Sequence, residues 1–357
     1  MFLCVVLLCA GFALLTLFQA DRSIKFIVTI ILFLILVLFA GTRTSIVGRD
    51  YEEYKRLFSL FDGWGSFDTE AFVLYEPAII IIPQLSKFIV GYSWYLNFTF
   101  LLFAMLAIGT KLIAIRKSNI FFLSIIIYCS YLYFGQELIT IRAGVACGFF
   151  LLAIDDIVKK NDKLFFLKIG IAYLFHYSSF VFIIVWIIER LKVSYKLLYF
   201  GIVFSLIIAF LKVNLLTLLR LDIIFPKVKM YLILLELETD IPVNVFNFRI
   251  LFSLLFLFLF VSRISVFSKM KMFPILIKTH MLSIILFFSL SPTAMVFSLR
   301  IFDLLSVVQI LLYPYLIYLF KQRIVGYLFI FLFCLINYYY IFYVSEWFMD
   351  GYKSWLF

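Results

Sequence analysis

Residues 25–41 read KFIVTIILFLILVLFAG, a run in which only the first residue is charged. About 20 apolar residues are enough for a helix to cross the hydrocarbon core of a bilayer. A charged island, GTRTSIVGRDYEEY at 41–54, overlaps the end of this run. The chain therefore passes abruptly from a membrane-like stretch to a polar loop, and this pattern predicts a membrane protein.

The composition extends this prediction to the whole chain. Of 357 residues, 66% are hydrophobic and 14% are charged, and the mean hydropathy is +1.15. A soluble domain carries about 25–35% charged residues on its surface, so the composition excludes that class. The 47 Phe and 22 Tyr suit lipid-facing and interfacial positions. We predict an all-α polytopic integral membrane protein, with residues 1–357 forming a single membrane domain.

The apolar runs predict about 12 transmembrane helices, within a range of about 10–13. They are 2–18, 25–41, 95–113, 119–135, 139–157, 163–177, 178–188, 197–212, 247–262, 275–291, 301–320 and 324–344. Residues 1–20 lack the basic start of a signal peptide, so we expect a retained first helix. Residues 77–90 are short, and we expect Pro83 to interrupt them in a re-entrant or interfacial segment. The pair 163–177 and 178–188 could also be one helix.

Lysine and arginine in alternate loops predict the orientation, because short positive loops stay in the cytoplasm. One set of loops holds 18 of the 31 basic residues: 19–25, 111–118, 158–168, 189–196, 263–278 and 321–323. Lys111 is counted in this cytoplasmic set. Both termini then face outward, as do two long loops, 42–76 and 213–246. In the second of these, Val228–Leu237 is expected to lie on the membrane as a surface helix.

The two faces differ in the kind of basic residue that they carry. The cytoplasmic set has 13 Lys and 5 Arg, whereas the outer set has 6 Lys and 7 Arg. The outer arginines are Arg43, Arg49, Arg56, Arg142, Arg220, Arg249 and Arg300. A guanidinium fork holds phosphate oxygens with two hydrogen bonds, whereas lysine is a point charge. The outer face therefore has the composition of an anion-binding surface.

Arg43, Arg49 and Asp50 directly follow the second span. We interpret the two arginines as ligands of an anionic group, with Asp50 orienting one of them or acting as a base. Gly41 and Gly48 bracket the arginines and permit close approach of the backbone. The alternative is a salt-bridged loop that caps a helix.

Arg142 lies in GQELITIRAGVACG, just inside the fifth span. An arginine at this depth costs a few kcal/mol unless it is paired or faces water. Glu137, five residues earlier, is a possible partner. The small residues at 143, 144, 146 and 148 form a helix face that a neighbouring helix or a lipid tail could approach closely. Glu76, which precedes Pro77, is either a catalytic carboxylate or an ordinary loop acid.

His176 stands in YLFHYSSF, near the outer end of the sixth span. Histidine is the side chain best suited to move protons near neutral pH, so we interpret it as a candidate base. In the structural alternative, Ser178 and Ser179 satisfy its hydrogen bonds.

Arg249 and Arg300 begin the ninth and eleventh predicted spans. Side chains that snorkel to the interface are one explanation, and contact with an anion is the other. Asp303, one turn beyond Arg300, could be its ion-pair partner.

Several classes of chemistry have no support in the sequence. The five cysteines lie in apolar runs without metal-ligand spacing: Cys4, Cys9, Cys129, Cys147 and Cys334. With two histidines and no Walker, GxSxG, HExxH or DxD-type motif, we predict neither a metal nor a cofactor. The net charge of +11 is scattered over short loops, so nucleic acid is not a predicted partner.

Four segments together resemble the EpsG-type, Wzy-like polysaccharide polymerases of bacterial envelopes. They are GTR…GRDYEEYKRLF at 41–58, YEP at 75–77, IRAGVACGFFLLA at 141–153 and FHYSS at 175–179. The similarity covers about residues 30–190, and the remainder matches mainly in hydropathy.

The resemblance implies a GT-C-like, metal-independent glycosyltransferase of the bacterial inner membrane, with its active site on the periplasmic side. Its substrate would be an oligosaccharide repeat unit on undecaprenyl pyrophosphate, and membrane lipid, a flippase and a chain-length regulator would be partners. The implied site places His176, Asp50 or Glu76 as catalytic residues. Arginines 43, 49, 142, 249 and 300 would stabilise the departing pyrophosphate. An O-antigen ligase, a membrane acyltransferase and a lipid-oligosaccharide flippase are the alternatives.

Overall fold

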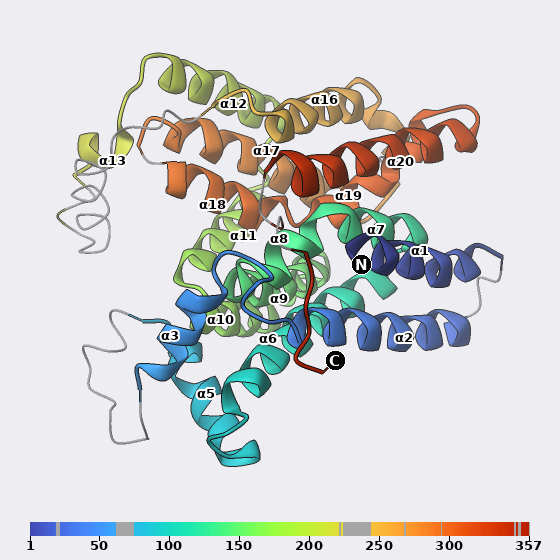
Figure 1. Ribbon diagram of the computed structural model, residues 1–357. Coiled ribbons are helices and arrows are strands. Elements are labelled where there is room, and N and C mark those ends of the chain that lie inside the picture. Colours follow the sequence, from blue (N-terminus) through green and yellow to red (C-terminus); the bar gives the residue numbers. More distant parts are fainter. Residues whose placement is uncertain are drawn as a thin grey trace. The chain divides into compact units, whose positions relative to one another are not determined.

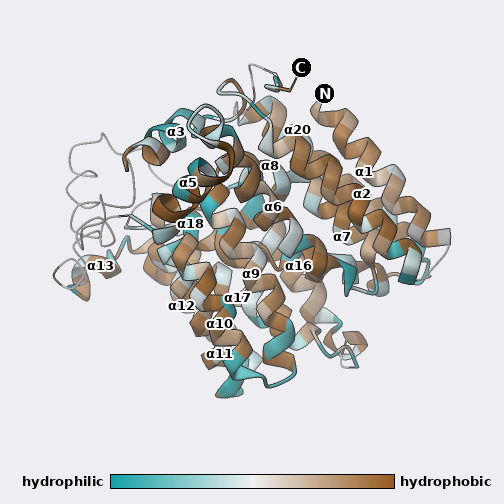
Figure 2. Cartoon of the chain, turned by 90° about the horizontal axis from the view of Figure 1, so that it is seen from below, coloured by the Kyte–Doolittle hydropathy of each residue, from teal (hydrophilic) through white to brown (hydrophobic). Residues whose placement is uncertain are grey.

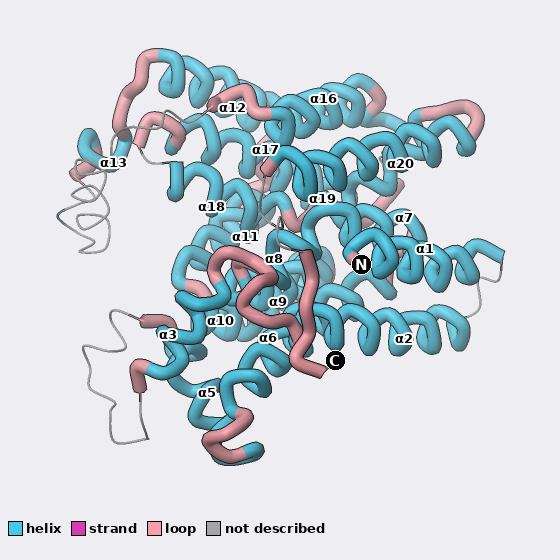
Figure 3. The backbone as a smooth tube through the Cα atoms, in the orientation of Figure 1, coloured by secondary structure: helices cyan, strands magenta, loops and turns pink. Residues whose placement is uncertain are grey.

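The computed structural model describes residues 1–18, 22–61, 75–220, 223, 244–267, 269–293, 295–345, 348 and 351–356. In these ranges all regular elements are helices, as Figure 3 shows, so the all-α prediction is confirmed. The expected surface helix Val228–Leu237 lies outside the described residues.

The chain divides into two compact units: Met1–Phe180 with Ile310–Phe357, and Val181–Gln309. Figure 1 labels the main helices of both. The first unit contains α1 (Phe2–Phe18), α2 (Arg22–Gly41), α3 (Tyr51–Ser59), α5 (Pro77–Val90), α6 (Tyr95–Arg116), α7 (Phe121–Ile127), a π-helix (Tyr128–Leu132), α8 (Tyr133–Leu138), α9 (Ile141–Val158), α10 (Asp162–Phe175), a 3₁₀-helix (Tyr313–Leu319), α20 (Arg323–Tyr339) and a π-helix (Tyr340–Val344).

The second unit contains α11 (Phe182–Arg190), α12 (Tyr195–Phe210), α13 (Leu215–Leu218), α16 (Phe248–Ser262), a 3₁₀-helix (Ile264–Phe267), α17 (Phe273–Leu290) and α18 (Met295–Ser306). The 3₁₀-helix Tyr177–Val181 and α19 (Gln309–Leu312) lie at the boundaries between the units. Within the second unit, α17 packs against α12, α18, α16 and α11. Lys278 Nζ of α17 lies 2.9 Å from Glu189 Oε2 of α11.

Among the described residues, six helical stretches are long and apolar enough to cross a membrane: Arg22–Gly41, Tyr95–Arg116, Phe121–Leu138, Phe273–Leu290, Phe297–Leu319 and Arg323–Val344. Four shorter apolar helices accompany them: Phe2–Leu15, Pro77–Val90, Tyr195–Phe210 and Phe248–Ser262. A multi-pass membrane protein is therefore confirmed at this level, and the larger number of about 12 crossings stays a prediction. Figure 2 shows that α1 and α2 are hydrophobic along most of their length, whereas α3 carries a hydrophilic stretch.

The structure corrects the prediction for residues 77–90 and decides between the two alternatives for residues 163–188. Pro83 does not interrupt residues 77–90, because α5 continues through it with the proline buried on its inner face. The fixed φ of proline is compatible with a helix, although Pro83 donates no hydrogen bond to the Ile79 carbonyl and its ring crowds that carbonyl. Residues 163–188 form two helices, because His176 is extended (φ −154°, ψ 111°) and ends α10.

In the first unit α6 packs against α9, α2 and α5. Its approach to α9 depends on Gly148, since a Cβ atom built there would lie 1.9 Å from Thr110 Oγ1. The small-residue face of α9 is thus covered by a neighbouring helix, one of the two alternatives expected for it. At the C-terminal end of α2, a Cβ on Gly41 would lie 2.9 Å from the Cα of Leu101 in α6, so these two helices are also closely packed.

Gly148→Ala is expected to destabilise the protein by about 1–3 kcal/mol, because the added methyl group must displace Thr110 or push α6 and α9 apart. Thermal unfolding of the detergent-solubilised protein measures the effect. Gly170→Ala in α10 is the matched control, since a Cβ atom added there would have nothing within 4 Å. There the higher helix propensity of alanine should leave the midpoint equal or slightly raised. Equal midpoints for both variants would contradict close packing at Gly148.

The C-terminal tail pairs with the loop that follows α2. Arg43 and Ser354 form an antiparallel β-bridge, and the N–H of Trp355 donates to the carbonyl of Thr42 at 2.9 Å. The ring of Phe39 stacks on that of Tyr352, and the Phe2 ring lies against both. The two termini and the end of α2 therefore meet at one end of the first unit. That this end faces outward stays a prediction.

Candidate functional site

Glu76 stands at the start of α5. Its backbone is extended (φ −62°, ψ 137°), as the following Pro77 requires. The carboxylate makes no capping bond to the helix, and only 7% of the residue is exposed. A buried carboxylate must find partners elsewhere, and it finds them on two other helices.

Arg142 in the first turn of α9 supplies one partner. Its Nη1 donates to Glu76 Oε2 at 2.5 Å. The guanidinium carbon lies 5.4 Å from the centre of the Tyr54 ring, so α3 covers the arginine with an aromatic face. Residues from three helices, separated by long stretches of sequence, are thereby joined at one point.

His176 supplies the second partner from the end of α10. Its Nδ1 lies 3.6 Å from Glu76 Oε1, within ion-pair distance. The extended backbone at His176 turns the ring out of the helix, while the backbone N–H still donates to Ala172 at 3.0 Å. The next residue, Tyr177, donates from Oη to the carbonyl of Tyr75 at 2.9 Å and ties this turn to the start of α5.

The charges around Glu76 favour its ionised form. Burial alone would raise the pKa of this carboxyl, but the His176 imidazole and the Arg142 guanidinium outweigh it and lower the pKa to about 2. At neutral pH the cluster therefore holds a carboxylate between two nitrogen donors. A carboxylate placed on one ring nitrogen orients the imidazole and leaves the other nitrogen to exchange protons.

This shift has a consequence for stability. The folded pKa of Glu76 is below the unfolded value near 4.5, so the ionised cluster stabilises the fold above that value by about 3 kcal/mol. The contribution is lost as the pH falls from about 4.5 toward 2. The Glu76→Gln protein should therefore unfold at a clearly lower temperature than the wild type at pH 7. The difference between the two thermal midpoints should narrow between pH 5 and pH 3. Thermal midpoints of both proteins over this range measure it, and parallel curves would contradict it.

The structure separates Arg43 from Arg49. Arg43 is 1% exposed, whereas 63% of the Arg49 side chain is exposed and its Nε lies 3.6 Å from Asp50 Oδ1. The two arginines do not share a surface, and Asp50 pairs with the exposed one. The close backbone approach expected at the glycines is confirmed, since a Cβ on Gly48 (φ +89°) would lie 2.7 Å from the Leu138 carbonyl oxygen.

Arg249 and Arg300 both belong to the second unit. Asp303, expected to pair with Arg300, forms an ion pair with Arg249, whose Nη2 lies 2.5 Å from its Oδ1. The pair joins α16 to α18, and the Arg249 guanidinium lies over the ring of Phe302. Arg300 is exposed on α18.

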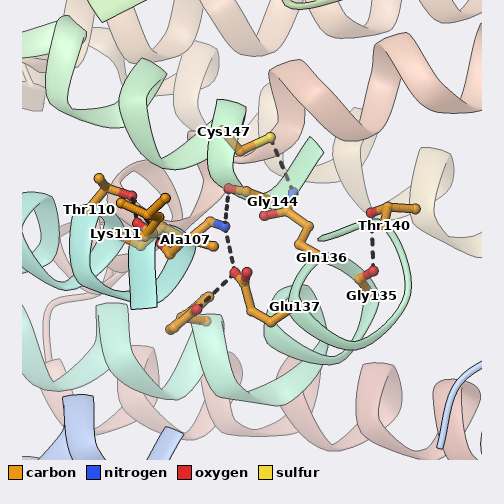
Figure 4. A network of polar contacts seen from close by, with 11 residues as sticks. Ala107, Thr110, Lys111, Gly135, Gln136, Glu137, Thr140, Gly144 and Cys147 are labelled. Atoms are coloured by element: carbon orange, nitrogen blue, oxygen red, sulfur yellow. Dashed lines mark hydrogen bonds and ion pairs between the residues drawn. The ribbon is translucent and has the colours of Figure 1, made fainter. Parts of the chain in front are cut away.

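Glu137 does not pair with Arg142, contrary to the sequence-based expectation. Lys111 Nζ donates to Glu137 Oε1 at 2.5 Å and to the Gly144 carbonyl at 2.7 Å, and Tyr128 Oη donates to the same carboxylate oxygen at 2.9 Å. Figure 4 shows Lys111 of α6 directed at Glu137 and at the first turn of α9. Lys111 is fully buried, so counting it among the cytoplasmic loop residues was wrong.

This buried ion pair was not predicted from the sequence. The available signal was a lysine near the end of one apolar run and a glutamate near the end of the next, each of which needs a partner at that depth. Because Lys111 holds the Gly144 carbonyl, the pair fixes the turn of α9 that also carries Arg142. Within the described parts of the chain, no group of three or more His, Cys, Asp and Glu residues is arranged to hold a metal ion.

No curated protein matches the chain, and no solved structure does. The sequence model of one family, described as the EpsG family, matches residues 26–356. This range contains Glu76, Arg142 and His176 and extends well beyond the segment 30–190 on which the resemblance rested. The chain belongs to the EpsG family.

Proposed function

We propose that this protein is a polysaccharide polymerase, which joins oligosaccharide repeat units carried on undecaprenyl pyrophosphate at the outer face of the bacterial inner membrane. Membership of the EpsG family indicates a function of the exopolysaccharide or O-antigen polymerase type. The observation that carries the finer proposal is the cluster of Glu76, Arg142 and His176, which combines a base, its orienting carboxylate and a cation. We further propose a GT-C-like fold and a reaction without a metal.

In the proposed reaction a hydroxyl of the acceptor unit attacks the anomeric carbon of the donor chain. The new glycosidic C–O bond forms as the bond from that carbon to the pyrophosphate oxygen breaks, and the pyrophosphate leaves with the electron pair. His176 takes the hydroxyl proton on Nε2, because its Nδ1 faces Glu76. Glu76 stabilises the imidazolium that results, and Asp50 is the alternative base.

Arg142 is proposed to act on the leaving group. It lies beside the proposed base, so a donor whose anomeric carbon reaches His176 would bring its pyrophosphate close to the guanidinium. Charge that develops on the pyrophosphate oxygens would be stabilised by this fixed cation. Arg49, Arg249 and Arg300 stay proposed contacts of the carrier phosphates, each within its own unit.

Deleting the gene tests the proposal in the cell. Long surface glycan should collapse to a single repeat unit on its acceptor, because flipping by a flippase and ligation continue while polymerisation stops. Gel analysis of the glycan ladder measures this, and complementation with the intact gene is the control. Long chains of normal length distribution would contradict the polymerase. Loss of even the single unit would favour a ligase or a flippase.

A further inference from the structure

Arg43 is a buried cation whose hydrogen-bonding capacity is mostly unused. Its Nη1 donates to the carbonyl of Ala40 at 2.5 Å. Within the described ranges, Nε and Nη2 have no acceptor and no carboxylate forms an ion pair with the side chain. Burial lowers the pKa of Arg43 to about 10, which leaves it protonated at neutral pH. Burying a charge in this way is unfavourable unless something compensates for it.

The compensation present in the structure comes from aromatic rings. The guanidinium carbon lies 5.0 Å from the centre of the Phe100 ring and 5.6 Å from that of Tyr51. A cation–π contact offsets part of the desolvation of a cation but supplies no acceptor for its N–H groups. Aromatic rings thus surround the Arg43 guanidinium, but no anion among the described residues accepts its Nε and Nη2 hydrogen bonds.

The C-terminal tail is hydrogen-bonded to the loop that carries Arg43. Besides the bridge at Ser354, the hydroxyls of Thr42 and Ser354 lie 2.9 Å apart, and the N–H of Thr44 donates to the Lys353 carbonyl at 3.0 Å. The indole Nε1 of Trp355 is a further buried donor without an acceptor among the described residues. Two paired segments therefore both carry buried donors whose acceptor is missing.

Helix α3 forms the cover. Tyr51 and Tyr54 lie one turn apart on its buried face, Tyr51 against Arg43 and Tyr54 against Arg142. The opposite face is exposed and charged, with Glu52, Glu53, Lys55 and Arg56. One short amphipathic helix therefore covers both the unsatisfied arginine and the arginine of the proposed reaction centre.

We propose that Arg43 is an inner phosphate-binding site, which α3 closes in the free protein and uncovers when a phosphate group of a membrane-borne lipid enters. Arg43 follows the apolar helix α2 by two residues, and the 20 residues of α2 match the thickness of the hydrocarbon core, so Arg43 would reach the depth of lipid phosphates. A phosphate oxygen pair would satisfy both free N–H groups in the fork geometry of arginine. The identity of the bound lipid, the polyprenyl pyrophosphate carrier, rests on the proposed polymerase function. The phosphate site itself does not.

Binding and stability measurements on the full-length, detergent-purified protein test this. Three probes are compared: sodium pyrophosphate, undecaprenyl pyrophosphate without sugar, and phosphatidylglycerol in nanodiscs. Arg43→Met should weaken binding by about 10–100-fold, the loss expected for hydrogen bonds to a charged group. It should also raise the thermal midpoint of the unliganded protein, because a buried charge that the rings compensate only in part is replaced by an uncharged methionine of similar length. Arg56→Met, on the exposed face of α3, should change neither.

The outcomes separate the proposal from a structural role. If Arg43 only supports the fold, Arg43→Met lowers the midpoint and leaves binding as in the wild type, which overturns the site. Arg43→Lys keeps the charge and should still lose most of the affinity, since it lacks the fork. Stronger binding of both pyrophosphates than of phosphatidylglycerol supports the carrier, whereas binding of phosphatidylglycerol alone assigns the site to a bulk lipid and separates it from the proposed polymerase. No phosphate binding by the wild type overturns it.

Movement of α3 has its own readout. Leu57 lies on the buried face of α3, and a cysteine there is protected while the cover is closed. In a Cys4→Ser background, which removes the exposed native thiol, pyrophosphate should accelerate maleimide labelling of Leu57→Cys several-fold. Adding Arg43→Met should abolish the acceleration. If the labelling rate of Leu57→Cys is unchanged when pyrophosphate is bound, α3 does not open and this part of the proposal is wrong.

Discussion

His176→Gln is expected to lower the polymerisation rate by about 10²–10⁴-fold, the usual contribution of a positioned general base. Glutamine keeps a polar, hydrogen-bonding side chain at the end of α10 but takes up no proton near neutral pH. The measurement is chain elongation by the purified protein from lipid-linked repeat units, together with binding of the same donor. Binding should be retained, because the imidazole acts on the acceptor hydroxyl.

His280→Gln provides the matched control. His280 is fully buried, and its Nε2 lies 3.1 Å from the Ser253 carbonyl, a contact that a glutamine amide can replace. We expect its elongation rate to stay within a few-fold of the wild type. A His176→Gln protein that elongates normally would transfer the role of base to Asp50 or Glu76. The partner of the base can be tested in the same assay, since Glu76→Gln should lose most of the rate per folded molecule, measured below the lowered unfolding temperature of this variant.

Arg142→Lys is expected to reduce elongation by about 10²–10³-fold, the cost of removing one donor from a site of developing negative charge. Lysine keeps a positive charge, but its single nitrogen cannot reach Glu76 and a phosphate in the geometry of the planar fork. Both kcat and kcat/KM should fall, because the interaction strengthens as the pyrophosphate leaves. Single-turnover elongation from a lipid-linked donor measures the chemical step directly.

Arg116→Lys is the control for this substitution. Arg116 ends α6, is exposed, and lies over the ring of Phe26, away from the carboxylate cluster. Its elongation rate should match that of the wild type. Equal rates for the two lysine variants would reduce Arg142 to a residue that neutralises Glu76. Combining Arg142→Lys with Glu76→Gln should cost less than the sum of the two changes, since the residues act as one unit.

The sequence predicted the helices well because a long apolar helix is recognised from a local property, the length of an apolar run. Glu76, Arg142 and His176 were each singled out, but their meeting was not foreseen. Sequence distance suggested Glu137 as the partner of Arg142, whereas the true partner lies 66 positions away. Pairing of buried charges is decided by tertiary packing, which one sequence does not show.

Lys111 illustrates the other limit. A count of positive residues cannot distinguish a lysine that ends a membrane helix from one that lies inside it. Here α6 continues to Arg116, so Lys111 is one full turn inside the helix and is enclosed by α8 and α9. The burial of Arg43 was likewise not foreseen, since its neighbours in the sequence are polar while its neighbours in space are aromatic.

The pairing of the tail with the loop after α2 sets an order of events during synthesis. Thr42 and Ser354 are 312 positions apart, so the loop leaves the ribosome long before its partner exists. At the usual rate of about 5–20 residues per second, the loop waits for at least about 15 seconds. The end of the first unit that carries Arg43 is therefore completed only after α20 has been synthesised, and chains that stall within α20 should reach the membrane with this end still open.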